Sequence, residues 1–113
     1  AGNATSCSDK PSVLADVVEN SWLLSVDSWK PLEKYSILNL ANEWGPANSS
    51  VWQDSYIGAV AKMRAAGYLS TLMIDAGGCG QDIDDLVHHA AQVFDSDPQK
   101  KLRTSLNQSF QSP

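Results

Sequence analysis

Two short apolar runs, each followed by a polar side chain, constrain the fold of this chain more than any other feature. The first run leads into Asn42 and Glu43, and the second ends in Asp75. The first does not alternate strictly between apolar and polar residues, which is typical of a strand buried on both faces of a parallel sheet. With a weaker third run, the predicted strands cover residues 35–41, 69–75 and 102–106.

Helical patterns separate these runs. A first helix is predicted with Ser8 or Asp9 as its cap and Pro11 in its first turn, and it should end near Trp29. A second is predicted from a capping box at 50–53 to a stop at Gly67, and a third from about Asp82 to Asp97. Alternating helices and strands predict an α/β fold with a parallel sheet, in one domain covering residues 1–113.

Composition excludes several classes of partner. The net charge is −5, with only 8 Lys and Arg and no basic run, so we expect no binding to nucleic acid or to an anionic membrane. No apolar stretch approaches the roughly 20 residues of a membrane span. We expect no cofactor. We also expect no metal, because His88 and His89 are neighbours on a predicted helix, point about 100° apart and cannot bind one ion together.

The polar residues after the predicted strands are the candidates for chemistry. Asn42, Glu43 and Asp75 would lie at the carboxyl ends of parallel strands, where α/β barrels place their active sites. A carboxylate that is partly desolvated there has a raised pKa and suits general acid catalysis. From the pattern alone, a single Glu after a strand is more often a helix cap or a surface residue.

Residues 37–45, Ile-Leu-Asn-Leu-Ala-Asn-Glu-Trp-Gly, resemble the fourth-strand signature of glycoside hydrolase family 5. The resemblance continues through Arg64-Ala65-Ala66-Gly67, through residues 71–76 and through residues 93–98, and it is strongest to the β-mannanase branch. It implies a partial (β/α)8 barrel built around strands four to six. A whole barrel of this type needs roughly 250 residues.

The resemblance also implies roles for individual residues. Glu43 matches the general acid/base of a retaining endo-β-glycosidase, and Asn42 matches the residue that hydrogen-bonds the sugar 2-hydroxyl. Trp44 and Asp75 are expected to contact the substrate, a polysaccharide or oligosaccharide such as mannan or a β-glucan. The family's nucleophilic Glu has no counterpart here, so we expect the isolated chain to be inactive; Asp75 is the nearest substitute by topology.

The sequence departs from the family pattern in its loops and its tail. Asn107 and Ser109 stand where the sixth strand is followed by His and Tyr, and Cys79 stands where mannanases commonly have Trp. Two alternatives therefore stay open. The chain could be a carbohydrate-binding module in which Trp44 and Trp52 stack on sugar rings, or a structural barrel segment without activity.

Unpaired strand edges and an apolar sheet face predict self-association. We expect Ile37, Leu38, Leu72 and Ile74 to form an exposed apolar face, and a homo-oligomer to shield Ile37 and Leu72. The alternative is a monomer in which residues 1–34 fold over that face.

Several features indicate a secreted protein. Asn3, Asn48 and Asn107 each begin a glycosylation sequon. The chain starts at Ala1 without Met, as expected of a processed or excised product. Cys7 and Cys79 are either free thiols or one disulfide bond; an oxidising compartment favours the bond.

The cysteines give a first test. The resemblance places Cys7 and Cys79 in loops on the same face of the barrel. A bond between them should stabilise the fold by roughly 4 kcal/mol, because it closes a long loop in the unfolded chain. Thiol titration of the unreduced, denatured protein should find no reactive thiol, and two reactive thiols would rule the disulfide out.

Overall fold

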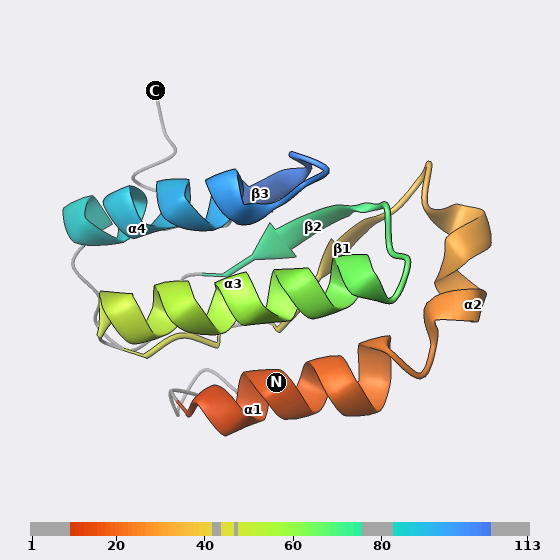
Figure 1. Cartoon of the computed structure of the whole chain (residues 1–113), viewed down its shortest axis with the longest axis horizontal. Coiled ribbons are helices and arrows are strands. Elements are labelled where there is room, and N and C mark those ends of the chain that lie inside the picture. Colours follow the sequence, from red (N-terminus) through yellow and green to blue (C-terminus); the bar gives the residue numbers. More distant parts are fainter. Residues whose placement is uncertain (1–9, 42–43, 47, 76–82, 105–113) are drawn as a thin grey trace.

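The computed structural model describes residues 10–41, 44–46, 48–75 and 83–104. Its strands form one parallel sheet in the order β1-β2-β3, with a helix between successive strands (Figure 1). The elements are α1 (Pro11–Val17), η1 (Val18–Trp22), α2 (Val26–Trp29), η2 (Lys30–Leu32), β1 (Ile37–Asn39), α3 (Ser49–Ala65), β2 (Thr71–Ile74), α4 (Ile83–Ser96) and β3 (Leu102–Thr104). The α/β fold and the element order are as predicted, although β1 and β2 are shorter than predicted.

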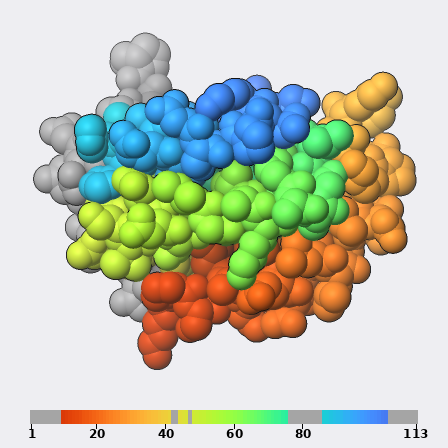
Figure 2. Space-filling model, in the orientation of Figure 1, coloured from red at the N-terminus to blue at the C-terminus, as the bar shows by residue number. Residues whose placement is uncertain are grey.

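Helices α1, α3 and α4 lie side by side in one layer over the sheet (Figures 1 and 2). The register pairs Leu38 with Leu72 and Leu72 with Leu102, which puts these three residues on one sheet face. Leu38 and Leu72 are at most 3% exposed, so this face carries the core beneath the helices.

The prediction of an exposed face made by Ile37, Leu38, Leu72 and Ile74 is wrong for three of its members. Leu72 and Ile74 are fully buried and Leu38 nearly so, whereas Ile37 is 47% exposed. Strand side chains alternate between faces, so the face away from the helices carries a mixed set instead. That set, called the inner face below, is Ile37, Asn39, Thr71, Met73 and Arg103.

The ends of α3 show which local signals the chain uses. Asn48 is the N-cap, and its side chain accepts hydrogen bonds from the backbone N–H groups of Ser50 and Val51 at 2.9 and 3.1 Å. The helix thus begins before the predicted capping box at 50–53. It ends at Ala65, just before the predicted stop at Gly67, whose φ of 105° favours a residue without a side chain.

The first predicted helix is interrupted. Lys10, without a side-chain cap bond, is the N-cap of α1, and Pro11 opens the helix as expected. The predicted caps Ser8 and Asp9 lie outside the described residues. The helix does not run through to Trp29, because η1 widens its turns and the chain leaves helical structure before α2 begins.

A buried ion pair joins the end of α3 to the segment before β3. The guanidinium of Arg64 contacts both carboxylate oxygens of Asp97, at 2.8 and 2.9 Å, and both side chains are at most 5% exposed. Arg64 also donates to the backbone carbonyls of Tyr68, Ser70 and Lys101. One side chain therefore ties together the segments that enter β2 and β3.

Burial alone would raise the pKa of Asp97. The hydrogen bonds from Arg64 and from the backbone N–H groups of Lys101 and Gln99 outweigh it and lower this pKa from 3.8 to about 2. Asp97 therefore stabilises the fold fully above its unfolded pKa. That stabilisation is lost as the pH falls through about 2.

We predict that Asp97→Ala lowers the free energy of unfolding by about 3–5 kcal/mol, because it leaves the Arg64 charge buried and unpaired. Urea denaturation at neutral pH measures this change. Glu19→Gln is the matched control: it breaks the exposed pair with Lys62, 3.4 Å apart, and should cost no more than about 1 kcal/mol. Equal effects of the two substitutions would contradict this account.

Candidate functional site

The carboxyl ends of β1 and β2 meet at one edge of the sheet. The strands pair in parallel, and the pairing extends past β1 through a 3.2 Å bond from the Leu40 N–H to the Met73 carbonyl. Asp75 directly follows β2. Asn42 and Glu43, the predicted sugar-binding and acid/base residues, lie outside the described residues, but Ala41 before them and Trp44 after them are both buried.

Two side chains of α3 hold the backbone of Asp75. The indole N–H of Trp52 donates to the Asp75 carbonyl at 2.9 Å, and the Asp75 N–H donates to the Tyr56 hydroxyl oxygen at 3.2 Å. Asp75 itself is 9% exposed. Burial, reinforced by the nearby Asp75 charge, raises the pKa of Tyr56 above its usual range, so this hydroxyl stays protonated at any working pH.

Trp44 is a core residue. Its side chain is fully buried, its indole N–H donates to the Lys10 carbonyl at 2.9 Å, and its ring meets that of Tyr56 edge-on at 5.3 Å. The Trp44 ring therefore has a structural role, and the prediction that it contacts a substrate is wrong. Trp52 is equally buried, so neither ring presents a face on which a sugar could stack.

Sequence reasoning missed the polar function of the aromatic residues. The spacing of Trp22, Trp52 and Tyr56 predicts only apolar positions on helix stripes, whereas each also makes a hydrogen bond at the end of a strand. The indole of Trp22 donates to the Leu40 carbonyl, just after β1, at 3.0 Å. Only the residue types indicate these hydrogen bonds, since a buried Trp or Tyr usually has a hydrogen-bond partner for its polar atom.

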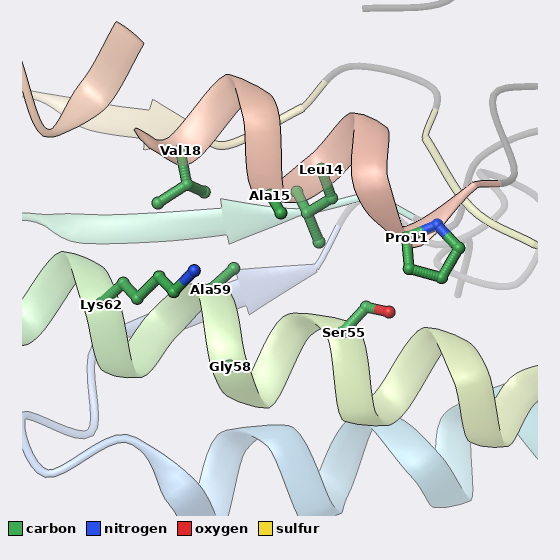
Figure 3. Close-up of a pocket in the computed structure, with 8 residues that line it drawn as sticks. All are labelled: Pro11, Leu14, Ala15, Val18, Ser55, Gly58, Ala59 and Lys62. Carbon is green, nitrogen blue, oxygen red and sulfur yellow. The ribbon is translucent and has the colours of Figure 1, made fainter. Parts of the chain in front are cut away.

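A groove of about 180 Å³ lies between α1 and α3, on the helical layer (Figure 3). Leu14, Val18 and Gly58 contribute to its lining, and Lys62 is the charged residue among the described lining residues. No carboxylate of a described residue lines it, so the described lining offers no acid/base pair. Within the described residues, no three side chains could hold a metal ion, and no helix has the length and apolar character needed to cross a membrane.

The remaining predicted residues divide into two groups. Cys7, Cys79, Asn3 and Asn107 lie outside the described residues, and the disulfide bond and glycosylation at all three sequons stay predictions. Asn48 is exposed, and its N-cap bonds use the side-chain oxygen rather than the nitrogen to which a glycan is attached.

No protein-family model matches the chain. Over 87 residues it is 38% identical to a mannan endo-1,4-β-mannosidase of Salipaludibacillus agaradhaerens, a match that covers 76% of this chain and 28% of the relative. A mannan endo-1,4-β-mannosidase of Streptomyces lividans is 37% identical over 82 residues, covering 71% of this chain and 21% of the relative.

Solved structures agree with these relatives. The β-mannanase of Streptomyces thermolilacinus superposes with a TM-score of 0.70 and 36% identity, over 80% of this chain and 31% of that one. This chain thus spans about a third or less of the proteins it matches, and its sheet corresponds to part of their TIM barrel. The chain is a homologue of the bacterial mannan endo-1,4-β-mannosidases over a segment of their length, as its resemblance to glycoside hydrolase family 5 indicates.

Proposed function

We propose that this chain supplies the acid/base half of a retaining endo-β-mannosidase site that acts on mannan. In this proposal Glu43 donates its proton to the glycosidic oxygen while the bond to the sugar C1 breaks, and later removes a proton from water. Asn42 hydrogen-bonds the 2-hydroxyl of the reacting sugar. The nucleophilic carboxylate comes from outside residues 1–113.

The observation that carries the proposal is the adjacency of two strand ends. The motif with Glu43 follows β1, Asp75 follows β2, and the two strands are direct neighbours with the same direction. Side chains after such strands share one edge of the sheet, where barrel enzymes assemble their sites. The homologous β-mannanases support mannan as the substrate, and one solved relative, from Thermomonospora fusca, is a mannohexaose complex.

The carbohydrate-binding alternative loses the feature that suggested it. It relied on Trp44 and Trp52 as stacking platforms, and both rings are fully buried. Binding without hydrolysis would have to use other groups at the carboxyl edge, such as the Asp75 carboxylate.

A chimera tests the proposed chemistry. Residues 10–104 of this chain would replace the matching segment of the Salipaludibacillus agaradhaerens β-mannanase, which provides the rest of the barrel. We predict that the chimera releases reducing sugar from mannan and that Glu43→Gln lowers kcat by at least about 100-fold, the usual contribution of a general acid. A folded chimera that keeps its activity after Glu43→Gln would contradict the proposal.

The chain on its own serves as the control for the missing nucleophile. It should release no reducing sugar from mannan or carboxymethyl-cellulose, because retaining hydrolysis needs two carboxyl groups about 5–5.5 Å apart. Activity near that of an intact β-mannanase would show that Asp75, or another carboxylate of this chain, supplies the second group.

Secretion and self-association stay part of the proposal. The sequons and the expected disulfide bond support secretion. Ile37 is half-exposed on the inner face and could be shielded by a second copy, whereas Leu72 is already buried within the chain and cannot take the predicted part in that contact. We predict a dimer or larger assembly in sedimentation equilibrium at low micromolar concentration. A clean monomer of 12.2 kDa would contradict it.

A further inference from the structure

We propose that Trp52 and Tyr56 are positioning residues, which fix the direction in which Asp75 leaves β2 and thereby set its contact with the sugar. This inference rests on the proposed function and deepens it, because it assigns the orientation of Asp75 to two side chains of α3. Neither residue touches the substrate in this account.

The side chains of Trp52 and Tyr56 bind the backbone of Asp75 where the strand-to-strand hydrogen bonds of β2 end. The last paired residues of β2 are Met73 with β1 and Ile74 with β3. The next peptide groups belong to Asp75, which is buried, and buried backbone groups need hydrogen-bond partners. Trp52 takes the carbonyl and Tyr56 takes the N–H, at 2.9 and 3.2 Å.

The holding groups are themselves fixed. Trp52 and Tyr56 are one helical turn apart on α3, both fully buried, and their rings meet edge-on at 5.2 Å. Tyr56 also packs against Trp44, whose indole is bonded to the Lys10 carbonyl. The rings of Trp44, Tyr56 and Trp52 therefore form a continuous buried cluster. This cluster links the segment that follows Glu43 to Asp75 at the end of β2.

The same arrangement occurs independently at the neighbouring strand. Trp22, from the helical segment that precedes β1, donates its indole N–H to the Leu40 carbonyl just beyond that strand. Trp52, from the helix that precedes β2, does so at Asp75. Core packing alone would be served by any large apolar side chain, whereas a directed N–H at each strand end fixes the exit of the backbone. A misplacement of about 1 Å in a site can cost 100-fold in rate.

A double-mutant cycle on the full chain tests whether Trp52 acts through Asp75. Titration calorimetry with mannohexaose would compare the wild type, Trp52→Phe, Asp75→Ala and the double variant. We expect Trp52→Phe to weaken binding about tenfold, the effect of one hydrogen bond, and to have no further effect once Asp75 is Ala. Trp29→Phe is the matched control, because among the described residues the Trp29 indole makes no hydrogen bond to the end of a strand. The affinity of this variant for mannohexaose should equal that of the wild type.

Tyr56→Phe gives a second, gentler variant, since it removes a single oxygen atom. Hydrogen exchange followed by NMR should show the Asp75 amide exchanging at least about tenfold faster in this variant. The loss in the free energy of unfolding, measured in urea, should be too small to explain this faster exchange. Unchanged protection of this amide would overturn the inference, as would additive effects of Trp52→Phe and Asp75→Ala.

The two arms separate failure of the inference from failure of the proposed function. If the wild-type chain does not bind mannohexaose, the proposed sugar site is contradicted and the positioning role falls with it. This holds even if hydrogen exchange shows that Tyr56 holds the Asp75 amide. If the wild type binds and the cycle is additive, the sugar site stands and only the positioning role is refuted.

Discussion

The buried backbone groups at the two ends of a short parallel sheet are the constraint on which this structure depends. Within the part of the chain that the structure describes, the paired segments are only 3 or 4 residues long, so the buried backbone beside them needs other hydrogen-bond partners. Side chains from the helices provide the missing bonds. Arg64 serves the segments that enter β2 and β3, and the indoles of Trp22 and Trp52 serve the exits of β1 and β2.

The two sets of bonds differ in what they do for the molecule. Arg64 and Asp97 lie at the amino ends of the strands, away from any candidate chemistry, and their pair contributes to stability. The aromatic bonds lie at the carboxyl ends, where parallel α/β folds place their sites, and the bond from Trp52 holds the Asp75 carbonyl. A change at the first end should therefore alter folding, and a change at the second should alter the proposed recognition of a sugar.

Local patterns predicted much of the fold but not its polar contacts. The alternation of helices and strands, the stop at Gly67 and the three strands follow from periodicity and turn residues that act over a few positions. The N-cap at Asn48 was missed because a Ser-x-x-Gln pattern begins two residues later and resembles a capping box. The interruption after α1 was missed because Trp22 fits the apolar stripe, although its indole is bonded 18 residues away, at Leu40.

The candidate site was predicted by resemblance and by the topology of strand ends, and both depend on sequence order. What a Trp does with its polar atom depends on which strand end its helix covers, and no short pattern contains that information. The sequence therefore left sugar stacking by Trp44 and Trp52 open as an alternative, although their indoles donate to carbonyls that are 34 and 23 residues away.

We propose that the carboxyl edge of β1 and β2 binds sugar. The most direct measurement is an NMR titration of the chain with mannohexaose, in which amide shifts are mapped onto the structure. The account predicts shifts concentrated at Leu40, Trp44 and Asp75 and at the residues between Ala41 and Trp44. Shifts confined to the groove between α1 and α3, or no shift at saturating sugar, would contradict it.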